Sequence, residues 1–109
     1  MYRYEARLIR WVDGDTADLD VDLGFHLSHA IRVRLFGVDC PELHTPEGKS
    51  ALAFVLGIVP VGSAVEIVTV KDRTEKYGRY LASIYRDGES VVERLIAAGH
   101  VKRASAATS

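Results

Sequence analysis

Carboxylates and arginines recur in three separate segments of this 109-residue chain. Aspartates supply the oxygen ligands that a hard divalent cation prefers, a glutamate can accept a proton from water, and a planar guanidinium can bind two phosphate oxygens at once. Hydrolysis of a phosphate ester uses all three, because negative charge develops on its oxygens in the transition state. The sequence therefore predicts a phosphodiester-hydrolysing site with these candidate residues: Asp15, Arg34, Asp39, Glu42 and Arg79.

Asp15 and Asp39 are the candidate cation ligands. Calcium tolerates irregular oxygen geometry, so two carboxylates, a main-chain carbonyl and several waters are enough to form a site. The segment 13–16, Asp-Gly-Asp-Thr, is by itself better explained as a turn. Glu42 alone fits a surface glutamate near a helix start, and Arg34 alone fits a strand arginine in a weak surface ion pair.

Cys40 is the only cysteine, which excludes an intramolecular disulfide. It lies between Asp39 and Pro41, and carboxylates close to a thiol raise its pKa and suppress the reactive thiolate. We therefore expect an inert side chain at Cys40 rather than a nucleophile.

The segment from Lys71 to Arg79 holds four basic residues against two acidic ones. A basic loop that carries an exposed aromatic ring can hold a phosphate and stack a base. Lys76 and Tyr77 are therefore candidate substrate contacts, and a solvated turn is an equally good interpretation.

Two other groups of metal-ligating residues favour ordinary structure. His26 and His29 lie in a predicted loop without a cysteine partner, which argues against a zinc site. Asp18, Asp20 and Asp22 alternate with apolar residues, and such a row is typical of a solvated strand face that discourages edge pairing.

Composition restricts the possible partners. The length predicts one domain, over residues 1–103, followed by a frayed tail at 104–109. A formal net charge of −1 predicts only modest affinity for a polyanion. No apolar run approaches the roughly 18 residues that cross a bilayer, so a membrane role is not expected. No signal-peptide pattern opens the chain, which predicts a cytoplasmic location unless a signal was removed.

Alternating and helical patterns give the elements that position these residues. Apolar and polar residues alternate as in half-buried strands, and Thr45-Pro46 and Ser90 are typical helix starts. The predicted strands cover about 2–11, 17–23, 31–36, 65–70 and 80–85, with a loop at 24–29, and the helices cover 46–59 and 91–98. This order fits a mainly β fold, a five-stranded barrel of the oligonucleotide-binding type (OB-fold) with two short helices.

The same motifs, in this order and at these separations, closely resemble the staphylococcal nuclease (thermonuclease) family from about Leu8 to Lys102. The resemblance implies the same barrel, a Ca²⁺ cofactor, and hydrolysis of DNA and RNA with little sequence preference, leaving 3′-phosphate ends. It assigns Glu42 to the attacking water, Arg34 and Arg79 to the phosphate, and the backbone carbonyl of Cys40 to the cation. The family tyrosines that pack on the nucleotide are replaced here by residues 101–103, Val-Lys-Arg.

We therefore expect a monomeric endonuclease that favours single strands. The sequence identifies no protein partner. A nucleic-acid or protein binding module on the same barrel is the alternative, as is a small interaction domain with a vestigial metal site. Because binding modules usually lose the catalytic set, the presence of all five residues favours the enzyme.

Overall fold

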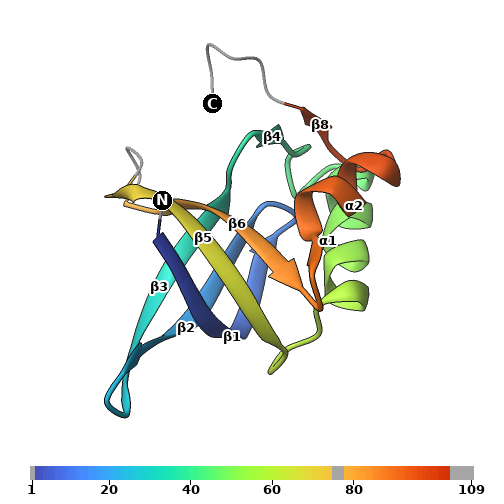
Figure 1. Cartoon of the computed structure of the whole chain (residues 1–109). Helices are drawn as coiled ribbons and strands as arrows, with labels where there is room; N and C mark the ends of the chain where they lie inside the picture. The colour runs from blue at the N-terminus through green and yellow to red at the C-terminus, as the bar shows by residue number, and fades with distance from the viewer. Residues whose placement is uncertain (1, 75–77, 104–109) are drawn as a thin grey trace.

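The computed structural model describes residues 2–74 and 78–103, including the side chains of 2–69 and 78–103. Five strands form a barrel in the order β3-β2-β1-β5-β6, and a parallel pairing of β3 with β6 closes it (Figure 1). Their bounds are β1 Tyr2–Asp13, β2 Thr16–Gly24, β3 Leu27–Leu35, β5 Ala64–Thr74 and β6 Tyr80–Arg86. The predicted five-stranded OB-fold barrel is confirmed.

Strand alternation builds the core. Side chains that point into the barrel are almost fully buried, and their neighbours along each strand face outward, as the period of two requires. Each strand contributes at least one large inward side chain: Leu8, Leu19, Val33, Ile67 and Ile84 are each at most 2% exposed.

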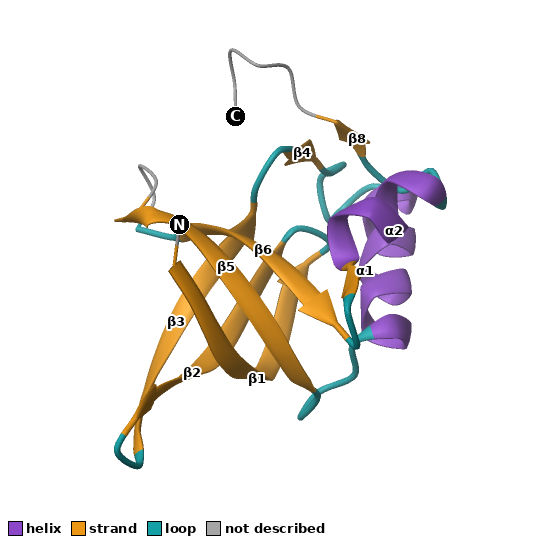
Figure 2. Cartoon of the chain, in the orientation of Figure 1, coloured by secondary structure: helices purple, strands orange, loops and turns teal. Residues whose placement is uncertain are grey.

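Two helices cover one side of the barrel (Figure 2). Helix α1 (Pro46–Ile58) begins where the Thr45 hydroxyl accepts the Gly48 N–H at 3.0 Å, and helix α2 (Val91–Ala97) begins at the corresponding cap by Ser90. Both helix starts were predicted from these capping residues. Neither described helix has the length and hydropathy needed to cross a bilayer.

The loop predicted at 24–29 is wrong. Strand β3 begins at Leu27, and only Phe25 and His26 form the turn between β2 and β3. Both turn residues have positive φ angles, 54° and 61°, which make a tight hairpin without the usual Asn-Gly signal. Leu23, which continues the alternation of the buried Leu19 and Val21, is 51% exposed because the hairpin extends beyond the barrel (Figure 1).

Three two-residue strands were not predicted: β4 (Val38–Asp39), β7 (Glu89–Ser90) and β8 (Lys102–Arg103). Strand β8 pairs antiparallel with β4, so Val38 lies opposite Arg103 and Asp39 lies opposite Lys102. The last described residues therefore support the segment that carries a candidate cation ligand.

Candidate active site

The β1–β2 turn, the end of β3 and strand β4 meet beside α1 (Figure 1). The pairing of β2 with β3 sets Thr16 opposite Arg34, and the Leu35 N–H donates to the Asp15 carbonyl at 2.8 Å. These backbone contacts bring residues 15–16 and 34–35 together, although about twenty residues separate them in the sequence.

Asp15 is a buried carboxylate, with 8% of its surface exposed. Its Oδ1 accepts a hydrogen bond from the Thr16 hydroxyl at 3.0 Å, and its N–H donates to Asp13 Oδ1 at 3.0 Å. Burial, followed by the hydrogen bond and repulsion from Asp13, raises the pKa of Asp15 to about 6. A carboxylate whose charge is this poorly solvated favours a cation beside it.

Arg34 joins the two candidate ligands. Its Nη2 lies 3.7 Å from Asp15 Oδ2 and 3.7 Å from Asp39 Oδ1, and it donates to the Val38 carbonyl at 3.1 Å. Because Asp15 Oδ2 and Asp39 Oδ1 each lie 3.7 Å from the same nitrogen, the distance between these two oxygens is at most twice that value. Their oxygen chemistry fits a hard cation that keeps several waters. In the described part of the chain, no three or more His, Cys, Asp or Glu side chains are grouped so that they could hold a metal ion, so the rest of the ligand set would be carbonyl and water oxygens.

Cys40 follows Asp39 and is half-buried. Burial, and then the charges of Asp15 and Asp13, raise the pKa of the Cys40 thiol to about 12. The expected direction is confirmed, but the acting carboxylates come from the β1–β2 turn and not from the neighbours of Cys40 in the sequence. Nucleophilic chemistry at neutral pH is therefore disfavoured at this thiol.

Glu42 lies apart from this cluster. Its side chain is 80% exposed and its carboxylate meets only His44, with 3.4 Å between Oε2 and Nδ1, among the described residues. Its backbone is held firmly, since the Glu42 carbonyl accepts the hydroxyl and the N–H of Thr45 at 2.6 and 3.0 Å. The structure thus fixes where the Glu42 main chain lies and leaves its carboxylate able to change rotamer.

Arg79 reaches the cluster from the start of β6. Its Nη1 donates to the Thr16 hydroxyl at 3.1 Å, and the same hydroxyl donates to Asp15. Thr16 thus links Arg79 to Asp15, a candidate cation ligand. Because Thr16 is only 2% exposed, this link is shielded from solvent. Lys76 and Tyr77 lie outside the described residues.

Three residues at the site received no role from the sequence. Thr16 bridges Asp15 and Arg79, Asp13 accepts the Asp15 N–H, and Arg32 lines a hollow beside Arg79. Burial acts to raise the pKa of Asp13, but hydrogen bonds with Asp15 and Thr16 outweigh it and lower that pKa below 3.8. The signal for Arg32 was present, since it lies two residues before Arg34 on the same strand face.

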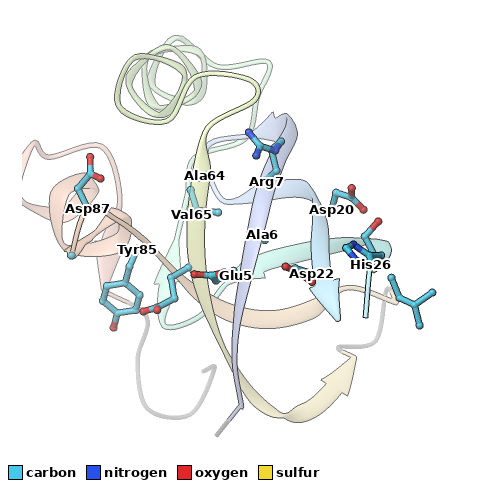
Figure 3. Close-up of a pocket in the computed structure, with 14 residues that line it drawn as sticks. Glu5, Ala6, Arg7, Asp20, Asp22, His26, Ala64, Val65, Tyr85 and Asp87 are labelled. Atoms are coloured by element: carbon cyan, nitrogen blue, oxygen red, sulfur yellow. The ribbon is translucent and has the colours of Figure 1, made fainter. Parts of the chain in front are cut away.

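A larger hollow, of about 760 Å³, lies away from this cluster (Figure 3). Figure 3 shows Glu5, Asp20 and Asp22 around it, on the neighbouring strands β1 and β2. Glu66 and Asp87 also line it, and Arg7 is the only arginine among its described lining residues, so it would repel a polyanion. Size therefore does not identify the site for a phosphate ester in this protein.

Comparisons with known proteins show which sequences this chain resembles. The family described as "Staphylococcal nuclease homologue" matches residues 32–108. An uncharacterized 38.1 kDa protein of Capnoides sempervirens is 29% identical, in an alignment 109 positions long that covers 89% of this chain and 31% of that protein.

Two further relatives match two thirds or more of this chain. The probable staphylococcal-like nuclease CAN1 of Oryza sativa subsp. japonica is 38% identical over 73 residues, covering 67% of this chain and 21% of the relative. Protein ParB of Escherichia coli is 34% identical over 80 residues, covering 73% of this chain and 41% of the relative. The chain therefore spans less than half the length of each of these proteins. Since the family match covers most of the residues, the chain belongs to the family of staphylococcal nuclease homologues.

Proposed function

We propose that this protein is a calcium-dependent endonuclease that hydrolyses phosphodiester bonds of DNA and RNA with little sequence preference. The observation that carries the proposal is the position of Arg34, whose Nη2 lies 3.7 Å from both Asp15 and Asp39. One side chain that can bind a phosphate thereby adjoins two that can bind a cation.

Asp15, Asp39 and the backbone carbonyl of Cys40 would hold Ca²⁺, which when bound supplies positive charge to the phosphate and a coordinated water. Arg34 binds a non-bridging oxygen of the scissile phosphate, and Arg79 stabilises charge that develops in the transition state. Glu42 orients the attacking water and accepts its proton, after its exposed carboxylate turns toward the cluster. Family membership supports these roles: the family match, residues 32–108, includes Arg34, Asp39, Cys40, Glu42 and Arg79, whereas the role of Asp15 comes from the resemblance of its motif.

Of the finer features, the 3′-phosphate ends follow from the resemblance and the contacts from Lys76 and Tyr77 follow from the basic segment 71–79; the others are the expectations stated above. We propose 3′-phosphate products, a preference for single strands, action as a cytoplasmic monomer, and contacts from Lys76 and Tyr77 to the substrate. Residues 101–103 carry no tyrosine that could stack on a substrate base. We therefore propose a weak base preference.

One observation favours a binding module instead: the Glu42 carboxylate is 80% exposed and has no contact with Asp15, Arg34 or Asp39 among the described residues. Turnover separates the two functions. Single-stranded DNA is incubated with the protein plus calcium, and plus a calcium chelator, at several protein concentrations. We expect fragments with 3′-phosphate ends only with calcium. Binding without cleavage at every concentration would identify a module and reject the enzyme.

A further inference from the structure

A hollow of about 380 Å³ lies beside the proposed catalytic cluster, and two arginines line it. Its described lining consists of Val12, Asp13, Thr16, Arg32 and Arg79. Thr16 and Arg79 connect it to Asp15 through the hydrogen bonds already described. Arg32 has no part in that cluster, so its presence here calls for a separate explanation.

Arg32 is held in a fixed orientation by Asp18. Its Nε donates to Asp18 Oδ1 at 2.8 Å and its Nη2 donates to Oδ2 at 3.1 Å, a two-point contact that fixes the guanidinium plane. Asp18 also accepts Arg10 Nε at 2.7 Å, so one carboxylate serves two guanidinium groups. The group of three retains one positive charge, and the Arg32 side chain is 43% exposed.

The strand geometry relates Arg32 to Arg34. They lie two residues apart on β3, hence on the same face, with an offset of roughly 6.6 Å along the strand. This offset is close to the spacing of successive phosphates in a nucleic-acid strand. A strand whose scissile phosphate lies at Arg34 can therefore bring its next phosphate to Arg32.

We propose that Arg32 forms a second phosphate subsite, which binds the phosphate adjacent to the scissile one. The proposal rests on the proposed nuclease function and specifies its substrate: a strand with at least two consecutive phosphates, rather than an isolated phosphodiester. Arg79 lines the same hollow. Asp13 lines the hollow as well, so two arginines and one carboxylate face it, which suits the binding of a single phosphate.

The first test measures binding and needs no cleavage. A fluorescent single-stranded oligonucleotide is titrated with protein at several salt concentrations in the presence of a chelator. For each phosphate that the protein no longer neutralises, the slope of log affinity against log salt becomes shallower by about 0.7. Arg32→Ala should reduce the slope by this amount, and Arg32→Lys, which keeps the charge, should restore most of it. The control is Arg3→Ala, another exposed strand arginine paired with a carboxylate, Glu66 on β5, and its slope should match wild type.

The second test measures kcat/KM on two substrates, a nucleoside nitrophenyl phosphodiester and a trinucleotide. Arg32→Ala should lower kcat/KM on the trinucleotide about tenfold more than on the single phosphodiester. Equal losses on both substrates, or an unchanged salt slope in a variant with a native circular dichroism spectrum, would overturn the subsite. A wild-type protein that cleaves neither substrate, with the slope change present, would reject the nuclease and retain the subsite.

Discussion

Asp15 is the residue at which function and stability oppose one another. Its pKa is raised from 3.8 to about 6 because burial and Asp13 disfavour the ionised form. A folded-state pKa above the unfolded value means that the protonated group contributes stability below pH 3.8, and that this contribution is lost as the pH rises through about 6. At neutral pH, without a cation, the ionised Asp15 therefore destabilises the fold.

Asp15→Asn should stabilise the cation-free protein at pH 7 by about 1–2 kcal/mol, because the amide needs no ionic solvation. The gain should vanish at about pH 3.5, where the wild-type carboxyl is already protonated. Urea unfolding at both pH values measures this. Asp39→Asn is the matched control, since its carboxylate is 63% exposed and its replacement should change stability little. A less stable Asp15→Asn protein at pH 7 would contradict this account.

Calcium should raise the Tm of the wild-type protein, since a ligand that binds only the folded state stabilises it by an amount that grows with the logarithm of free ligand above Kd. A rise of several degrees is expected at saturating calcium, as about 1 kcal/mol shifts the Tm of a domain of this size by about 4–8 °C. Thermal unfolding with calcium or chelator gives the result. The shift should disappear in Asp15→Asn, and an equal shift in that variant would place the cation elsewhere.

The sequence predicted the individual candidate residues better than it predicted their connections. The spacing of Asp15, Arg34 and Asp39 pointed to one site, and the structure brings them together. Thr16 and its link to Arg79 could not be predicted, because a strand threonine gives no sign of which side chains lie across from it. The distance of the Glu42 carboxylate from the cluster also depends on a rotamer that the sequence does not encode.

At the scale of elements, helix α1 packs closely against two segments of the site, the β1–β2 turn and the segment that contains Glu42. A Cβ atom on Gly48 would lie 1.9 Å from the Glu42 carbonyl oxygen, and one on Gly14 would lie 2.7 Å from the Ala51 Cβ. Both loops therefore contact the helix so closely that only glycine fits. The helix fixes the relative positions of the Glu42 backbone and the β1–β2 turn.

Gly48→Ala should lower both stability and turnover, although alanine is normally the better helix former. The added methyl would collide with the Glu42 carbonyl, at a cost of about 1–3 kcal/mol, and displace the backbone that carries the proposed base. Gly57→Ala is the control in the same helix: its Cβ would meet nothing within 4 Å, and it should gain about 0.5–1 kcal/mol. Urea unfolding and initial rates test the pair. Stabilisation by both substitutions would show that the close contact is not rigid.

The predicted elements were accurate where a pattern was long. The strands and helices that carry regular alternation or capping residues were found from the sequence, as with Thr45 and Ser90. The Phe25-His26 turn was missed because left-handed backbone is uncommon outside glycine and asparagine. Strands β4 and β8 were missed because two-residue strands show no periodicity and depend on a distant partner.

At the scale of the whole molecule, the site depends on pairings between strands that lie far apart in the sequence. Parallel pairing of β3 with β6 closes the barrel, and the pairing of β8 with β4 completes the segment that holds Asp39. Val101 is 6% exposed and belongs to the core, whereas Lys102 and Arg103 are exposed. Removing Lys102 and Arg103 should therefore disturb the site and leave the hydrophobic core intact.

A chain that ends after Val101 should fold and lose at least about tenfold in calcium-dependent turnover, because Asp39 loses its strand partner and the site loses its fixed geometry. A chain that ends after Arg103 should retain wild-type activity. Circular dichroism and cleavage rates on single-stranded DNA compare the two. Full activity in the shorter chain would show that β4 holds its position without β8.

The pairing of β4 with β8 also determines when, during translation, the proposed site can form. Residues 15, 34 and 39 leave the ribosome early, yet the strand that supports Asp39 is translated only at residues 102–103. Because chains emerge from the N-terminus, the barrel strands are all available before the site can be completed. If the proposed nuclease function is correct, we expect a nascent chain to remain inactive toward nucleic acid, including its own messenger, until β8 has emerged.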